Sequence, residues 1–222
     1  MKKIFFFLLL VPTLLFSQSY DWQKLGPKIE EVSYNSETGP MAFSDDGSKL
    51  IIGAPTHDGP NGNQSGNVRI FEYVSGSWLQ IGSDINGESA NERCGTSVSI
   101  NSNGNIIALA SPNYNGPNGN STGKVRVFNN ISGVWTEIGT GIDDFYAGTE
   151  GGFSISLNSS GNIIAISAPG YASWQYPTGY VRIYELISGV WTQIGSDISE
   201  AGINNGDYFG TSISINSAGN IV

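Results

Sequence analysis

Charged residues are scarce in this sequence. Only 13% of the 222 residues are charged, about half of the usual quarter. Lys and Arg number 10 against 19 Asp and Glu, which gives a formal net charge of −9. A protein that binds duplex nucleic acid needs a basic stripe on its surface. We therefore expect no nucleic-acid partner.

Metal ligands and nucleophiles are also few. The chain has one Cys and one His, so a disulfide framework and a Cys/His zinc site within the chain are both excluded. No Gly-x-Ser-x-Gly nucleophile elbow occurs. His57 beside Asp58 indicates an acid–base pair only weakly, and we interpret His57 as a solvated loop residue. The sequence predicts no catalytic residues and no cofactor.

Long apolar runs are absent except at the N-terminus. Met1-Lys2-Lys3 precedes an apolar stretch from Ile4 to Phe16, which is shorter than the roughly 20 residues that span a bilayer. Small residues follow in Ser17-Gln18-Ser19. This layout is typical of a secretory signal peptide. We expect residues 1–19 to be removed, and the mature protein to be secreted or held at the cell surface without membrane insertion.

Glycine and short repeated blocks make up much of what remains. The chain has 30 Gly and 11% aromatic residues, and the aromatics argue against disorder. The blocks "GTSVSINSNGNIIALASP" from Gly95 and "GFSISLNSSGNIIAISAP" from Gly152 align with each other. Turn glycines recur 57, 57 and 58 residues apart, at positions 47, 104, 161 and 219. Such a fixed period predicts a repeat architecture.

Each repeat carries four short β signals. In the second copy they are Ser97–Ile100, Ile106–Ser111, Lys124–Asn129 and Val134–Ile138, separated by turns rich in Asn, Ser and Gly. Four antiparallel strands in each repeat predict the blades of an all-β β-propeller. A β-solenoid is the main alternative, although its repeats are usually shorter.

The repeats divide the chain into six segments. About three full blades are present, fewer than the four to eight of a closed propeller, so we interpret the sequence as an incomplete ring and a truncated chain. The segments are the signal peptide (1–19), an orphan fourth strand with its connection (20–38), blade repeats one (39–94), two (95–151) and three (152–209), and the start of a fourth (210–222).

The blocks resemble the FG-GAP repeat family, whose best-known members are the propeller heads of integrin α subunits. Phe209-Gly210 matches the FG pair and Gly53-Ala54-Pro55 matches GAP, while Ser111-Pro112 and Ala168-Pro169 are partial copies. The chain is most similar to the variant found in secreted bacterial multi-repeat proteins. The resemblance implies an extracellular propeller with a binding or adhesion role.

Calcium is the cofactor that the resemblance to this family would imply. Integrin-type repeats often bind calcium in an acidic loop between strands one and two. Here that loop is reduced to short turns such as Asp45-Asp46-Gly47 and Ser102-Asn103-Gly104, whereas calcium needs six to eight oxygen ligands. We therefore expect no calcium site and no other metal.

Some residues that recur in every repeat have a structural interpretation. The sequence favours Arg69, Arg126 and Arg182 as strand residues with packed stems and heads at a blade edge. The repeated tryptophans, Trp78, Trp135 and Trp191, are interpreted as packing between blades. We expect the single cysteine, Cys94, to be a small buried filler rather than a reactive thiol.

The long connections on one face are the predicted contact surface. They hold 13 of the 19 acids, so we expect a negative face that favours cationic partners. The third loop adds aromatic residues that could anchor a sugar ring or a protein. The candidate contact residues are Tyr171, Trp174, Tyr176, Asp143 and Asp144.

These sequence features are compatible with two classes of function. The first is a secreted or cell-surface scaffold that binds an extracellular protein or glycan without catalysis. The alternative is the propeller domain of an extracellular carbohydrate-active or other hydrolytic enzyme, with its catalytic part beyond residue 222. Near-interchangeable repeats favour the scaffold, because a catalytic site needs residues that differ from one repeat to the next.

Overall fold

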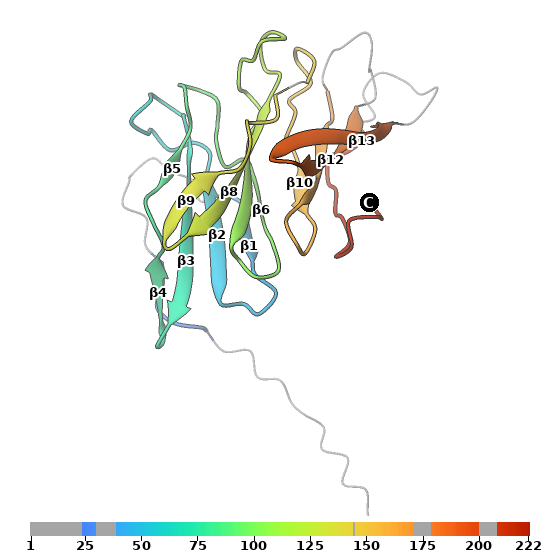
Figure 1. Ribbon diagram of the computed structural model, residues 1–222. Coiled ribbons are helices and arrows are strands. Elements are labelled where there is room, and N and C mark those ends of the chain that lie inside the picture. The colour runs from blue at the N-terminus through green and yellow to red at the C-terminus, as the bar shows by residue number, and fades with distance from the viewer. Residues whose placement is uncertain (1–23, 30–38, 144, 171–178, 200–207) are drawn as a thin grey trace, which may run out of the picture.

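The fold consists of three antiparallel β-sheets. The computed structural model describes residues 24–29, 39–143, 145–170, 179–199 and 208–222 (Figure 1). Throughout these ranges the regular secondary structure is β-strand, without a helix. The prediction of an all-β fold is therefore confirmed. In the same ranges no helix is long and apolar enough to cross a membrane.

Each sheet is built from strands that follow one another in sequence. The first sheet has the order β1-β2-β3-β4, and the short β5 pairs with β3 beyond the end of β4. Its strands are β1 (Met41–Phe43), β2 (Lys49–Ala54), β3 (Asn67–Val74), β4 (Ser77–Gln80) and β5 (Ile85–Asn86).

The second and third sheets repeat this order. The strands of the second are β6 (Ser97–Ile100), β7 (Ile106–Ser111), β8 (Lys124–Ile131) and β9 (Val134–Glu137). Those of the third are β10 (Ile155–Leu157), β11 (Ile163–Ala168), β12 (Tyr180–Ile187) and β13 (Val190–Ile198).

Serine side chains join the first strands of successive sheets. The Oγ atoms of Ser97 and Ser99 on β6 accept hydrogen bonds from the backbone N–H groups of Ile155 and Leu157 on β10, at 3.1 and 3.0 Å. Alternation along the strand turns Val98 and Ile100 to the opposite side, where they are buried. β6 therefore faces a neighbour on each side, and both of its surfaces are used.

Tryptophan indoles join the last strands of the sheets. Trp135 Nε1 donates to the carbonyl of Ile81 at 3.0 Å, and Trp191 Nε1 donates to Ile138 at 3.0 Å. Trp78 makes the matching bond, 3.2 Å long, to the carbonyl of Leu25. Residues 24–29 thus contact the first sheet in the way that the last strand of one sheet contacts the next sheet.

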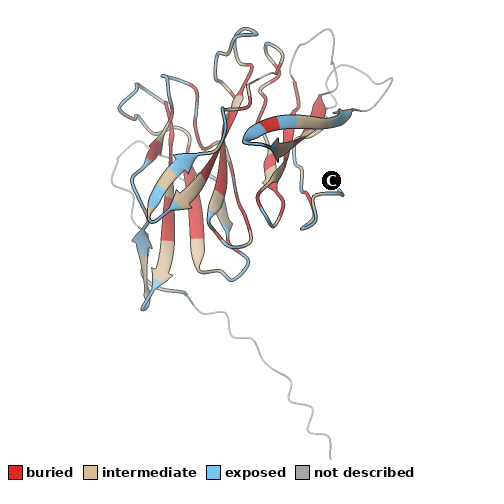
Figure 2. Cartoon of the chain, viewed as in Figure 1, coloured by how far each residue is buried: buried red, intermediate tan, exposed pale blue. Residues whose placement is uncertain are grey.

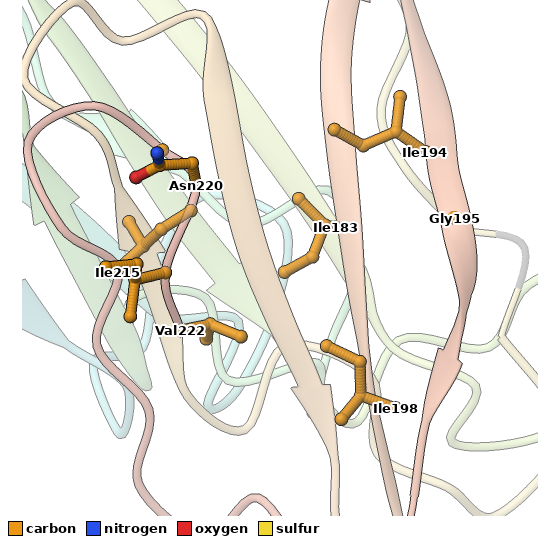
Figure 3. Close-up of a pocket in the computed structure, with 9 residues that line it drawn as sticks. Ile183, Ile194, Gly195, Ile198, Ile215, Asn220 and Val222 are labelled. Atoms are coloured by element: carbon orange, nitrogen blue, oxygen red, sulfur yellow. The ribbon is translucent and has the colours of Figure 1, made fainter.

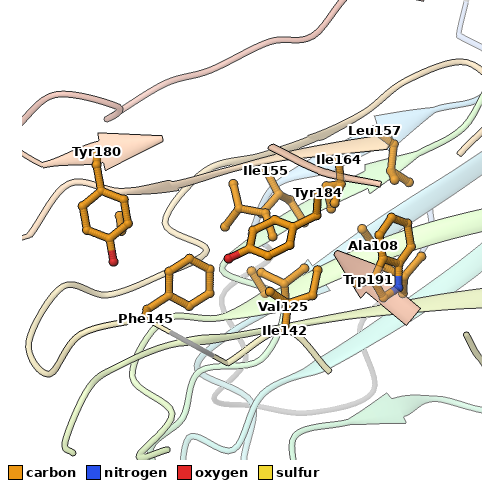
Figure 4. Packing of buried hydrophobic residues seen from close by; sticks show 14 residues of the cluster. Ala108, Val125, Ile142, Phe145, Ile155, Leu157, Ile164, Tyr180, Tyr184 and Trp191 are labelled. Carbon is orange, nitrogen blue, oxygen red and sulfur yellow. The ribbon is translucent and has the colours of Figure 1, made fainter. Parts of the chain in front are cut away.

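The core lies between the sheets. Figure 2 shows that burial is concentrated in the middle strands of each sheet. The largest cluster joins Val125 and Ala108 of the second sheet to Ile164 and Tyr184 of the third, with Phe145 from the connection between them (Figure 4). A second cluster joins the first and second sheets in the same way. Both faces of the second sheet therefore carry buried apolar side chains.

Candidate functional site

Most of the predicted contact residues lie outside the described residues. Tyr171, Trp174, Tyr176 and Asp144 belong to this group. Asp143 is described and half-buried. Partial burial lowers the pKa of Lys124, but the hydrogen bond that Lys124 donates to Glu88 and nearby charges, which include that of Asp143, together raise it. The contact surface around Trp174 stays a prediction.

The two described loops between second and third strands are ordered by the same hydrogen bonds. In the first sheet, Gln64 N–H donates to Asp58 Oδ1 at 2.8 Å. In the second sheet, Ser121 N–H donates to Asn115 Oδ1 at 2.9 Å. Because Asn replaces Asp without loss of this bond, the bond needs an oxygen acceptor and not a charge. Asp58 therefore has a structural role beside His57, whose place in the second loop is taken by Tyr114.

These loops pair with the connections that lead into the next sheet. Cys94 N–H donates to the carbonyl of Ser65 at 2.9 Å, and Gly151 N–H donates to Thr122 at 2.9 Å. Cys94 is fully buried. Burial raises the pKa of its thiol to about 11, although Arg126 nearby acts to lower it. This environment agrees with the interpretation of Cys94 as a buried filler.

One acid that was expected on the negative face lies inside the protein. Glu92 is only 2% exposed. Its carboxylate accepts hydrogen bonds from the backbone and hydroxyl of Ser89, both at 2.9 Å, and from the hydroxyl of Ser111 at 3.0 Å. The assignment of Glu92 to the surface was wrong, because a buried carboxylate can be stabilised by hydroxyl and amide donors that the linear sequence does not reveal.

The repeated arginines reach from one sheet into the preceding connection. Arg126 Nη2 donates to the carbonyl of Asn86 at 2.8 Å. Arg182 lies over the rings of Phe145 and Tyr146, at 5.7 and 5.4 Å from their centroids. Both arginines are buried rather than at an edge. The structural role stands for these two residues, but their predicted edge position was wrong.

The surroundings of these two arginines differ in one respect. Arg182 is held by Asp197 through two bonds, Nε to Oδ1 at 2.8 Å and Nη2 to Oδ2 at 3.1 Å. The residue that corresponds to Asp197 in the second sheet is Gly141. Arg126 instead has Glu88, with Nη1 and Oε1 3.6 Å apart. The two inter-sheet sites are therefore chemically distinct although their backbones match.

The acidic turn of the first repeat is satisfied by hydroxyl and amide donors. Asp46 accepts hydrogen bonds from Ser44 and Ser48, and these lower the pKa of its carboxyl to about 2. Asp45 Oδ2 accepts from the hydroxyl of Ser102 at 2.7 Å. In the described part of the chain, no group of three or more His, Cys, Asp or Glu residues is placed to hold a metal ion.

An apolar groove lies on the free side of the third sheet. It is formed by β12, β13 and residues 215–222, and Figure 3 shows its side chains, which include Ile183, Ile194, Ile198 and Val222. On the opposite side of the molecule Phe43 is 51% exposed, whereas the equivalent Ile100 is 9% exposed. The groove on the third sheet and the exposed side of the first sheet correspond to the faces that are buried between adjacent sheets in the rest of the molecule.

Comparison with known proteins gives a similarity of fold. No family model and no curated protein sequence matches the chain. A proposed 6-phosphogluconolactonase from Bacteroides fragilis aligns with 76% of the chain at a TM-score of 0.51 and 16% identity. One from Bacteroides uniformis aligns with 75% at a TM-score of 0.50 and 14% identity. The alignments span 41% and 42% of those two proteins.

Proposed function

We propose that this chain is part of an exported β-propeller that serves as a non-catalytic binding or adhesion scaffold. Sheets of four antiparallel strands whose first strands lie side by side are the parts from which a propeller is built. The Trp bonds between sheets repeat from one pair to the next, and the Ser bonds from β6 to β10 recur between Ser154 and Ile213; a ring of equivalent blades requires such repetition. The FG-GAP resemblance supports the same architecture.

The observation that carries the proposed role is a constant loop backbone with changing side chains. The loops around Asp58 and Asn115 keep the same hydrogen bonds, yet His57 of the first loop becomes Tyr114 in the second. A rigid frame that tolerates such exchanges is typical of a recognition surface. The aromatic and acidic residues Tyr171, Trp174, Tyr176, Asp143 and Asp144 are the proposed contacts.

The names of the structural neighbours do not favour an enzyme here. Identity of 14–16% shows a likeness of fold, and one fold hosts many unrelated functions. Two of the loop carboxylates, those of Asp58 and Glu92, are engaged in bonds that order the loops or join them to the next sheet. We therefore keep the hydrolytic enzyme as the alternative and not as the proposal.

Two measurements test the proposal. Expression with the native N-terminus in a bacterial host, followed by fractionation and mass spectrometry, should find the protein outside the cytoplasm with about the first 19 residues removed. An array of extracellular glycans and matrix proteins should then give binding that Trp174→Ala weakens without lowering the melting temperature. Retention in the cytoplasm with an intact N-terminus, or a Trp174→Ala effect on melting alone, would contradict it.

A further inference from the structure

A pocket with both polar and apolar lining opens between the first and second sheets. Its volume is about 360 Å³, at the lower end of the range of about 300–1,000 Å³ that holds small ligands. The connection after β4 forms one side, and β8 with the β8–β9 hairpin forms the other. The residues that carry the argument are Asp84, Asn86, Arg126, Phe128, Val134 and Trp135.

Arg126 provides hydrogen-bond donors inside this pocket. Its side chain is 9% exposed, and its Nη2 is engaged by the carbonyl of Asn86. Across the described residues, however, Arg126 Nε donates no hydrogen bond. In the third sheet the corresponding Nε of Arg182 is bonded to Asp197. The second sheet has Gly141 at that position, so the Nε edge of Arg126 lacks the internal carboxylate.

The position of Gly141 explains this difference. A Cβ atom at Gly141 would lie 2.3 Å from Cε of Lys124, so the stem of Lys124 occupies the space that a longer side chain would need. Lys124 is held there by Glu88, with Nζ and Oε2 2.8 Å apart. The loss of the carboxylate at 141 is therefore part of the packing in this sheet.

Asp84 provides acceptors in the same pocket. Oδ1 accepts from Gln80 Nε2 at 2.6 Å, and Oδ2 accepts from Asn67 Nδ2 at 3.2 Å. A carboxylate has about four acceptor sites, so each oxygen keeps room for one further donor. The two amide donors also fix the orientation of the carboxylate, which reduces the entropy that a ligand must overcome on binding.

The walls of the pocket are apolar and aromatic. Phe128 is buried, Trp135 is half-buried, and Val134 is 63% exposed at the mouth. Trp135 is fixed by its bond to the carbonyl of Ile81. Rigid aromatic walls with a few convergent polar groups are typical of a small-molecule site.

The local charge disfavours a strongly ionic ligand. Lys124 and Arg126 are balanced by Glu88 at 2.8 and 3.6 Å, and by Glu137, whose pKa is raised by partial burial and lowered by these two cations. Asp84 would repel an anion, and Arg126 would repel a cation. A hydroxyl group donates to a carboxylate and accepts from a guanidinium, so neighbouring hydroxyls on a ring satisfy both groups.

The geometry points to this pocket as a binding site for one neutral sugar ring, with hydroxyls between Asp84 and Arg126 and the C–H face against the aromatic wall. This inference rests on the proposed function, because it names the ligand class of a binding scaffold. The pocket uses residues that differ from the predicted contacts around Trp174, and so it is a second recognition element.

Saturation-transfer NMR on the full chain tests the inference with methyl glycosides of glucose, galactose, mannose and N-acetylglucosamine as probes. We expect at least one of them to bind. Asp84→Asn should weaken that binding about tenfold or more, because hydrogen bonds to a charged group are lost. Gly141→Asp requires the flexible end of Lys124 to move, and the new carboxylate should then abolish binding by pairing with Arg126 as Asp197 pairs with Arg182. Asp58→Asn, the same chemical change in a loop, is the matched control and should leave binding unchanged.

The outcomes distinguish failure of the pocket inference from failure of the scaffold function. Saccharide binding that survives both Asp84→Asn and Gly141→Asp would show that the sugar does not bind in this pocket. Binding of amino acids or carboxylic acids in place of the glycosides, lost in the same variants, overturns the sugar class. Binding on the glycan and protein array without any binding of the four glycosides also overturns this inference, while the scaffold function stands. If Gly141→Asp fails to fold, Asp84→Asn decides alone.

Discussion

Trp135 Nε1 donates a hydrogen bond to the carbonyl of Ile81 in the preceding sheet, at 3.0 Å. The same relation joins Trp191 to Ile138 and Trp78 to Leu25. Since Trp135 and Trp191 each pack between two sheets and satisfy a backbone carbonyl, they fix the spacing of neighbouring sheets near their last strands. The serine bonds between β6 and β10 fix the spacing of the second and third sheets at their first strands.

The Trp135 bond leads to a stability prediction. Trp135→Phe keeps most of the packing but removes the donor, so the free energy of unfolding should fall by about 1 kcal/mol, measured by urea denaturation. Val134 is exposed, and the first sheet has a serine, Ser77, at the equivalent position. Val134→Ser should therefore change stability by less than about 0.5 kcal/mol. Equal effects of the two substitutions would contradict the structural role of the indole N–H.

Two glycines with similar backbone conformations allow the cost of backbone strain to be measured apart from the cost of a steric clash. Gly123 has φ +85° and a Cβ there would lie 1.9 Å from the carbonyl oxygen of Gly151, whereas Gly133 has φ +87° and open space around it. Gly133→Ala should cost about 1–2 kcal/mol from the left-handed conformation alone. Gly123→Ala should cost at least about 2 kcal/mol more, because the backbone must move. Similar losses in urea denaturation would show that the loop and connection are not packed as described.

Asp46 gives a prediction of pH dependence. Hydrogen bonds from Ser44 and Ser48 lower its pKa to about 2, below the usual value of about 3.9 in an unfolded chain. Its contribution to stability is therefore complete above about pH 4 and is lost as the pH falls through about 2. Asp46→Asn, which copies Asn103 of the second turn, should lose less stability than the native protein between about pH 5 and pH 2. Thermal melting across this range checks the prediction, and parallel curves for the two proteins would refute it.

The buried thiol gives a prediction of reactivity. Because burial raises the pKa of Cys94 to about 11, the folded protein should react slowly with a thiol reagent at about pH 8, where a free cysteine is partly ionised. Denaturant should restore the ordinary rate. Rapid labelling of one thiol per chain in the absence of denaturant would show that Cys94 is accessible.

The local structure was largely predictable from the sequence. The strands expected at Ser97–Ile100 and Ile106–Ser111 coincide with β6 and β7, because alternating apolar residues and Asn-Gly turns are local signals. The length of β13, from Val190 to Ile198, was not expected. Its pairing with β12 includes a register shift between Val181 and Ile183, and such a shift depends on the packing of the whole sheet.

The candidate site was much less predictable. Asp84, Arg126 and Trp135 come from different strands and connections, so no short motif contains them. Arg126 lacks the carboxylate partner of Arg182 because position 141 is a glycine. The need for glycine there becomes clear only from the structure, in which the side chain of Lys124 lies against it. The burial of Glu92 likewise depends on Ser111, which lies in another part of the sequence. Contacts of this kind arise from the fold and not from residue patterns.

The most direct test of the scaffold account measures binding and turnover in the same sample. The purified protein is incubated with the glycans and matrix proteins that it binds on the array, and the ligands are then recovered and analysed by mass spectrometry. A non-catalytic scaffold predicts saturable binding and ligands of unchanged mass after prolonged incubation. Cleaved or otherwise modified ligand that accumulates with time, in proportion to protein, would contradict the account and favour the enzyme.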